Sequence, residues 1–234
     1  MSIALITGAT RGIGRATALR LAADGHTIAV GYGGDRAGAV ALADELGGFA
    51  AGGDLGERDA ADRLVDEVEA ALGPIDILIA NAGTSTPPTT IDAITNADWD
   101  RLVAVNLTAP FLLARRVLPG LLERGFGRIV FVSSVAAFTG GVIGAHYAAT
   151  KAGLHGLMHS VAQQGAAHGV TANVIAPALI ETDMLPGDPS ALAAKLPVQR
   201  LGTPEEVADL IAAMVANGYL TNQSILLDGG WHAT

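Results

Sequence analysis

Seven short apolar segments alternate with longer helical patterns along the chain, and this alternation limits the possible folds more than any other feature. The segments are almost continuously apolar, which is typical of strands that are covered on both faces. Parallel strands joined by right-handed helical crossovers give this pattern and form a doubly wound sheet. The seven predicted strands are Ser2–Thr7, Thr27–Tyr32, Phe49–Gly53, Ile75–Asn81, Arg128–Ser134, Thr171–Ala176 and Ser224–Asp228.

Helical patterns fill most of the intervals between these strands, and no low-complexity linker divides the chain. We therefore predict one α/β domain over residues 1–234. The segment 183–202 is different, because it carries three prolines around a short helical patch at 190–196. Long insertions in compact domains often cover a binding site, so we predict a substrate lid there. The predicted helices are Gly14–Ala23, Arg36–Leu46, Arg58–Leu72, Asp98–Leu122, His146–His168 and Pro204–Ala216.

Composition excludes several classes of protein. The 234 residues contain no cysteine, so a disulfide framework is impossible, and their formal net charge of -9 argues against general nucleic-acid binding. The N-terminus lacks the basic region of a signal peptide. No apolar run approaches the ~18 residues that a membrane span needs. We expect a cytoplasmic protein that has neither nucleic acid nor membrane as a partner.

The first predicted strand runs directly into a glycine-rich turn, TGATRGIG at 7–14, which opens a predicted helix. Glycines let the backbone approach a ligand closely, and a helix N-terminus offers free N–H groups and positive potential. A pyrophosphate suits this place, although a tight strand–helix turn can need glycine for its shape alone. The predicted contacts to a dinucleotide are Gly8, Thr10, Arg11, Gly12, Ile13 and Gly14.

The charge pattern after the second predicted strand favours NADP(H) over NAD(H). This strand ends at Tyr32, where an acidic side chain would bind the ribose diol of NAD. Asp35 lies beyond two glycines and could still reach the ribose. Arg11 in the turn and the nearby Arg36 could pair with a 2′-phosphate.

Tyr147 and Lys151 stand four residues apart on a predicted helix and therefore share a face. Only two of the 14 basic residues are lysines, so a lysine among alanines indicates a role that arginine performs poorly, with an exposed helix charge as the alternative. A nearby cation lowers the pKa of a phenol from about 10 by on the order of 1–3 units. Such a phenol can exchange a proton with a carbonyl or alcohol oxygen during hydride transfer.

These motifs occur in the order and spacing of the short-chain dehydrogenase/reductase family, which the chain resembles over essentially its whole length. The other motifs are NAG at 81–83, VNLTAP at 105–110, VSS at 132–134, YAATK at 147–151, APALIETDM at 176–184 and LLDGG at 226–230. The chain looks most similar to bacterial 3-oxoacyl-[acyl-carrier-protein] reductases of fatty acid biosynthesis. The resemblance implies a Rossmann-type fold of about seven strands.

The resemblance also implies a reaction, the NADPH-dependent reduction of a ketone, with a 3-oxoacyl thioester as the favoured substrate. An alcohol, sugar or steroid dehydrogenase of the same family that uses NAD(P) is the alternative. A non-catalytic nucleotide-sensing protein on the same fold is a remote one.

Individual residues take their expected roles from this resemblance. Tyr147 would be the general acid and base, and Lys151 would lower its pKa and hold the nicotinamide ribose. Ser134, 13 residues before Tyr147, would bind the substrate oxygen in preference to Ser133. Asn106 would position a water in a proton relay to Lys151, although the sequence alone also fits a buried structural amide.

Further cofactor contacts and partners are implied in the same way. Acyl-carrier reductases tend to carry basic residues near the mouth of the cleft, and this chain has Arg124 and His168 there rather than a clear arginine pair, which weakens the case for an acyl carrier protein as partner. A homotetramer is expected. His155 and His159 are spaced for zinc but lack a third ligand, so we expect no metal. The implied contacts are Asn81, Ala82 and Gly83 beside the adenosine, Asp54 and Leu55 at the adenine, and Ile180 and Thr182 at the carboxamide.

Overall fold

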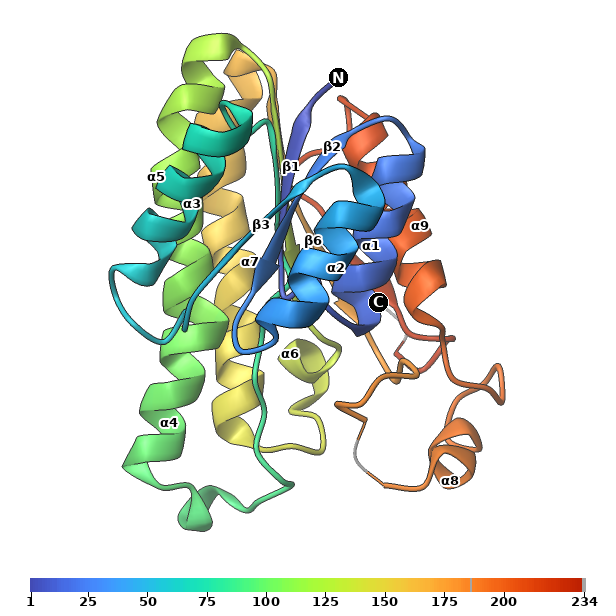
Figure 1. The fold of residues 1–234 in the computed structure, drawn as a ribbon. Coiled ribbons are helices and arrows are strands. Elements are labelled where there is room, and N and C mark those ends of the chain that lie inside the picture. The colour runs from blue at the N-terminus through green and yellow to red at the C-terminus, as the bar shows by residue number, and fades with distance from the viewer. Residues whose placement is uncertain (186, 233–234) are drawn as a thin grey trace.

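The computed structural model describes residues 1–185 and 187–232, which form a seven-stranded sheet with helices on both faces (Figure 1). The strand order is β3-β2-β1-β4-β5-β6-β7, and every neighbouring pair is parallel. The predicted doubly wound parallel sheet is therefore confirmed. The strands are β1 (Ile3–Thr7), β2 (Thr27–Tyr32), β3 (Phe49–Gly52), β4 (Ile77–Ala80), β5 (Gly127–Val132), β6 (Val170–Pro177) and β7 (Ser224–Leu227).

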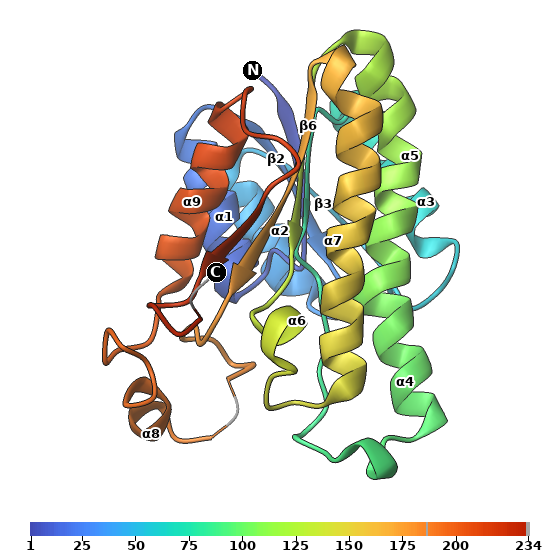
Figure 2. The same cartoon turned by 180° about the vertical axis from the view of Figure 1, so that it is seen from behind.

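Two apolar cores lie on the two sides of this sheet, which explains why the strands are apolar throughout. Successive residues of a strand point to opposite faces, so Leu5 enters one core and Ile6 the other. Figures 1 and 2 show the helices of each layer. One layer holds α1 (Gly12–Ala23), α2 (Arg36–Leu46) and α9 (Pro204–Ala216), and the other α3 (Ala60–Leu72), α5 (Ala109–Arg124) and α7 (Ala145–Gly165).

The long helix that we predicted at 98–122 is not a uniform α-helix. It begins with α4 (Asn96–Val103), passes through the π-helical turn η2 (Ala104–Thr108) and continues as α5. Taken together, Asn96–Arg124 is long and apolar enough to cross a membrane, but half of its most apolar window is buried inside the protein, as in a core helix. The helix predicted at 146–168 ends as α7 at Gly165, followed by the 3₁₀ turn η3 (Ala166–His168).

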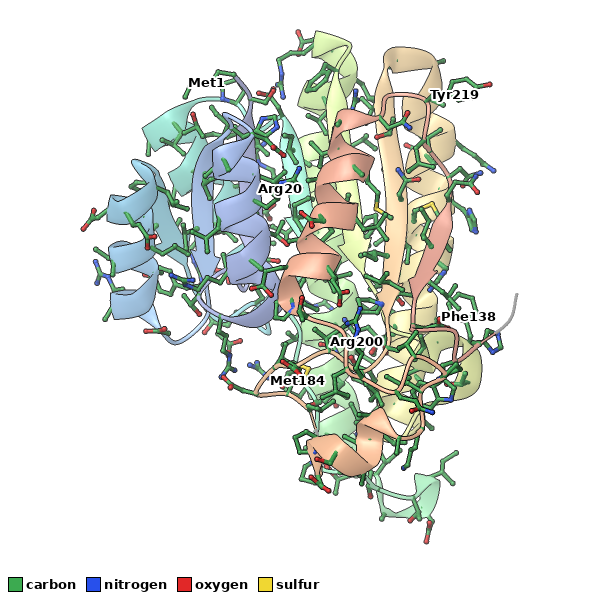
Figure 3. The ribbon with its side chains drawn as sticks, turned by 90° about the vertical axis from the view of Figure 1, so that its right-hand side faces the viewer. Met1, Arg20, Phe138, Met184, Arg200 and Tyr219 are labelled. Atoms are coloured by element: carbon green, nitrogen blue, oxygen red, sulfur yellow. The ribbon has the colours of Figure 1, made fainter. Side chains whose placement is uncertain are left out.

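The segment 183–202 carries the short helix α8 (Pro189–Ala193) and has a small apolar cluster of its own. Leu192, Leu196 and Leu201 pack there, and Trp231 from the C-terminal turn covers them. Arg200 lies in the loop before α9 (Figure 3) and bonds both carboxylate oxygens of Glu206 at 2.9 and 2.6 Å. Pro186 lies outside the described residues. The role of this segment as a lid stays a prediction.

Glu206 also completes the capping box that the sequence GTPEE predicts at the start of α9. The Thr203 side chain accepts a hydrogen bond from the Glu206 amide at 3.3 Å, and Glu206 accepts one from the Thr203 amide at 2.9 Å. The Arg200 bond, and then the Thr203 amide, lower the pKa of Glu206 to about 2. The end of the predicted lid is thereby fixed to the helix that covers the sheet.

Candidate active site

The carboxyl ends of β1 and β4 meet where the strand order reverses, and a threonine joins them. The Thr7 hydroxyl accepts hydrogen bonds from the amides of Asn81 at 3.1 Å and Ala82 at 3.0 Å. The Asn81 side chain donates in return to the carbonyls of Thr7 at 2.9 Å and Gly8 at 3.2 Å. Doubly wound sheets bind ligands in the crevice at such a reversal. Thr7 was not among the residues expected at this site, although a polar residue that ends a buried strand was the available signal.

The turn between β1 and α1 is tightly closed. A Cβ atom on Gly14 would lie 2.2 Å from the Gly8 carbonyl oxygen, and one on Gly8 would lie 3.1 Å from the Ala82 Cα. Gly8 and Gly12 also have positive φ angles of 65° and 51°. These glycines let the backbone form a cradle at the N-terminus of α1, where the N-cap residue Arg11 makes no side-chain cap. The cradle fits the pyrophosphate of a dinucleotide, because its N–H groups and helix dipole favour an anion.

The segment after β6 lies over this turn. A Cβ atom on Gly12 would approach the Thr182 methyl group to 3.1 Å, and Arg11 forms an exposed ion pair with Asp183 at 3.5 Å. Ile180 is buried and packs into the core shared with α1 and α9. The structure therefore brings the residues expected at the carboxamide next to those expected at the pyrophosphate.

Asp54 and Leu55 follow β3 rather than ending it. The Asp54 carboxylate accepts hydrogen bonds from Arg101 of α4 at 2.9 Å and from the Gly56 amide at 2.8 Å. The Arg101 bond is the main reason why the pKa of Asp54 is lowered. Leu55 is partly buried against the core on the side of α3 and α5. Asp54 thus joins β3 to α4, and its contact with adenine stays a prediction.

Tyr147 and Lys151 lie on the first turns of α7, side by side as expected. The Lys151 Nζ is 5.7 Å from the centroid of the Tyr147 ring and donates to the Val132 carbonyl of β5 at 2.9 Å. Both side chains are buried. Tyr147 packs against Leu102 of α4 and Ala136 of α6 (Ala136–Thr139). The ring of Tyr147, which α7 carries, is therefore packed between α4 and α6.

Burial shifts the pKa values of both Tyr147 and Lys151, and the shift of Tyr147 is opposite to the one we expected. It lowers the pKa of Lys151 to about 8, because an ammonium group loses hydration. It also raises the pKa of the Tyr147 phenol, and a hydrogen bond with Ser134 opposes this only in part. The net shift of the phenol pKa is therefore opposite to the expected one, because loss of hydration dominates, and the effect of Lys151 on it stays a prediction. A buried neutral phenol remains a proton donor throughout the neutral pH range.

Asn106 is completely buried in the π-helical turn, and its side-chain amide forms hydrogen bonds with the backbone of Thr84, which follows β4. Its Oδ1 accepts from the Thr84 amide at 2.8 Å, while its Nδ2 donates to the Thr84 carbonyl at 2.9 Å. A Cβ atom on Gly83 would lie 3.4 Å from Asn106 Oδ1 and 3.5 Å from Lys151 Nζ. The three residues therefore converge, although the Asn106 side chain is occupied by Thr84 and its relay role stays a prediction.

The two serines at the end of β5 point to different partners. The Ser134 hydroxyl accepts from the Ala136 amide at 3.1 Å and bonds to Tyr147. The Ser133 hydroxyl is buried and donates to the Lys151 carbonyl at 2.8 Å. The structure thus places Ser134, and not Ser133, beside the phenol, and its role in binding the substrate oxygen stays a prediction.

His146 is a buried residue of this region whose role the sequence did not indicate. Its Nε2 lies 2.9 Å from the Thr86 hydroxyl, and the Thr89 amide donates to the Ile143 carbonyl at 3.0 Å. These two bonds join the segment after β4 to the segment before α7. They fix the position of the chain beside Tyr147. Because they join residues 54 and 60 positions apart, nothing in the sequence indicated them.

The fold and this site are those of a dinucleotide-binding oxidoreductase. A family model for short chain dehydrogenases matches residues 2–191. The chain is 37% identical to an acetoacetyl-CoA reductase of Rhizobium meliloti, with 97% of each chain covered. It is also 37% identical to a 3-oxoacyl-[acyl-carrier-protein] reductase of Escherichia coli, with 98% of this chain and 97% of that protein covered.

A solved structure gives the same result. A blue fluorescent protein from a metagenomic library, in complex with NADPH, superposes with a TM-score of 0.91 and 33% identity over 99% of this chain and 98% of that chain. The protein therefore belongs to the short-chain dehydrogenase family and is an NAD(P)-dependent oxidoreductase.

Proposed function

We propose that this enzyme uses NADPH to reduce the 3-oxo group of an acyl thioester to a 3-hydroxy group. The observation that carries the proposal is that the buried side chains of Tyr147 and Lys151 meet the partly buried Ser134 at the carboxyl end of β5, beside the glycine cradle. The substrate class is supported by the names of the two relatives, an acetoacetyl-CoA reductase and a 3-oxoacyl-[acyl-carrier-protein] reductase.

The chemistry divides between the cofactor and the chain. When bound, NADPH supplies a hydride to the carbonyl carbon. Ser134 donates a hydrogen bond to the carbonyl oxygen and holds it near the phenol of Tyr147. Tyr147 then transfers its proton to this oxygen, which carries negative charge as the hydride arrives. Lys151 binds the nicotinamide ribose and stabilises the phenolate that remains.

Three features support NADP(H) over NAD(H). The Asp35 carboxylate caps α2 by accepting from the Gly38 amide at 2.9 Å, so it is occupied. A Cβ atom on Gly33 or Gly34 would meet nothing within 4 Å, which leaves room after β2 for a phosphate. Arg11 lies in the turn between β1 and α1 with its side chain 75% exposed, and exchanging its exposed ion pair with Asp183 for a 2′-phosphate would satisfy its charge.

A cofactor and substrate panel tests the proposal. We expect oxidation of NADPH with acetoacetyl-CoA, and kcat/KM at least about 10-fold higher with NADPH than with NADH, which corresponds to about 1.4 kcal/mol. Cyclohexanone and a steroid ketone are the controls for the alternative substrate class. Faster turnover of these ketones, or a preference for NADH, would contradict the respective part of the proposal.

The pKa of Lys151 gives a second test. Burial lowers this pKa to about 8, so the ammonium is present below about pH 8 and is lost above it. Since the pH dependence of kcat/KM reports the free enzyme, kcat/KM for NADPH should fall about 10-fold per pH unit above pH ~8. This fall of kcat/KM at alkaline pH should persist in Lys195→Met, which changes the exposed lysine of the predicted lid. It should disappear in Lys151→Met. A flat profile between about pH 7 and pH 9.5 in the wild type would remove Lys151 from cofactor binding.

Three further expectations from the sequence belong to the same proposal. They are a homotetrameric assembly, a cytoplasmic location and an acyl carrier protein as the bearer of the thioester. The acyl-carrier reductase among the relatives supports the last of these.

A further inference from the structure

A continuous chain of hydrogen bonds runs from the outer strand β7 to the backbone of Lys151, and the ring of His155 is its central member. The Ser224 hydroxyl of β7 lies 2.7 Å from His155 Nδ1. The other ring nitrogen, Nε2, lies 3.1 Å from the Ser133 hydroxyl, which bonds to the Lys151 carbonyl at 2.8 Å. From the sequence, His155 was weighed as a zinc ligand together with His159, and no metal was expected there.

The chemistry of the groups fixes the direction of this chain. A carbonyl oxygen can only accept, so Ser133 uses its one hydroxyl proton on Lys151. Its oxygen must then accept from His155, which places the proton of the neutral imidazole on Nε2 and leaves Nδ1 to accept from Ser224. Burial, and then the charge of His159, lower the pKa of His155, which keeps the ring neutral at neutral pH.

The ring is held in place by packing as well. The Phe138 ring of α6 meets it edge to face, with the ring centroids 4.9 Å apart and the planes at 88°. Phe138 lies at the surface (Figure 3), with its ring centroid 6.1 Å from that of His232. His155 therefore joins β5, α6, α7 and β7 at one point, one helical turn beyond Lys151.

Lys151 is bound to β5 at both ends. Its ammonium donates to the Val132 carbonyl at 2.9 Å, and its carbonyl accepts from Ser133, the residue that directly follows β5. Ser134, which bonds to Tyr147, follows directly. The rotamer of Ser133 thus determines how the first turns of α7 sit against the end of β5, and His155 is the donor that holds this rotamer.

We propose that His155 is a positioning residue of this enzyme, which fixes Ser133 and thereby the register of Lys151 and Tyr147 against Ser134. The inference rests on the proposed roles of Tyr147 and Lys151. His155 is expected to touch neither substrate nor cofactor. Misplacement of reacting groups by about 1 Å can cost about 100-fold in rate, so the loss of this bond should appear in kcat.

The test compares two substitutions at His155 with a matched histidine. His155→Leu removes both polar atoms, whereas His155→Gln keeps one acceptor and one donor at the end of the side chain. His159→Leu is the control, because His159 lies one turn further along α7 and bonds Asn222 at 2.6 Å without reaching β5. We measure kcat, KM, the Kd for NADPH and Tm for each purified variant.

We expect His155→Leu to lower kcat by about 10- to 100-fold while KM and the Kd for NADPH change less than about 3-fold. His155→Gln should restore kcat to within about 3-fold of the wild type, and His159→Leu should leave it unchanged. Wild-type kcat in His155→Leu would overturn the inference. Equal losses of kcat and Tm in the Leu and Gln variants would also overturn it, because they would indicate a structural role only. Turnover by Tyr147→Phe would instead refute the proposed roles on which the inference rests.

Discussion

Replacing Tyr147 by phenylalanine should lower kcat for carbonyl reduction by about 10²- to 10⁴-fold, the range that one general acid contributes. The phenol is buried, bonded to Ser134 and within 5.7 Å of the Lys151 ammonium, measured from the ring centroid. Water is therefore poorly placed to act as the proton donor instead. Because phenylalanine keeps the ring that packs on Leu102 and Ala136, the fold should remain intact. Stopped-flow measurement of NADPH oxidation in a single turnover reports the chemical step directly.

The same substitution at Tyr219 is the matched control, since this side chain is 97% exposed and lies before β7. It should leave kcat unchanged. The Kd for NADPH, measured by fluorescence titration, should change less than about 3-fold in both variants. A Tyr147→Phe enzyme with turnover within about 3-fold of the wild type would show that another group donates the proton.

Replacing Gly14 by alanine should raise the Kd for NADPH by at least about 10-fold and lower the free energy of unfolding by about 1–3 kcal/mol, a common cost of overpacking. The new Cβ atom would lie 2.2 Å from the Gly8 carbonyl oxygen and 2.6 Å from the Asn81 Nδ2. Neither neighbour can retreat easily, because Asn81 is bonded to the carbonyls of Thr7 and Gly8. The turn must therefore open, and its amide groups no longer converge on the pyrophosphate.

Gly156→Ala provides the control for this prediction. Gly156 lies inside α7, and a Cβ atom there would meet nothing within 4 Å. Alanine should therefore stabilise the helix by about 0.5–1 kcal/mol and leave NADPH binding unchanged. Urea unfolding and fluorescence titration of both variants provide the comparison. Wild-type affinity in Gly14→Ala would show that the cofactor does not depend on the closed turn.

Several parts of the site were predictable because they depend on local spacing. Tyr147 and Lys151 share a helix face because they are four residues apart, and the turn at Gly8–Gly14 follows from glycines between a strand and a helix. The capping box at Thr203 was also predictable, because it involves only neighbouring residues. The resemblance to the family added Ser134 and Asn106, for which local chemistry alone gave no decision.

Other parts depended on contacts between distant segments. The π-helical turn around Asn106 was not apparent in the periodicity of the helix, and it lets Asn106 bond Thr84. The direction in which the pKa of Tyr147 shifts depends on how completely the surrounding elements cover the phenol. We expected this pKa to be lowered, and burial raises it. The chain through His155 needs a serine of β7, 69 residues further along the sequence.

The sequence alone determined the layered sheet, the closed glycine turn between β1 and α1, and the pairing of Tyr147 with Lys151. These features depend on strand and helix periodicity and on i, i+4 spacing, which are properties of neighbouring residues. Tertiary structure alone decided which groups lose water and which hydroxyls exchange hydrogen bonds, as for Thr7 with Asn81 and Ser133 with His155. The physical reason is that hydration and hydrogen bonding depend on the distances between segments, and the folding of the whole chain sets those distances.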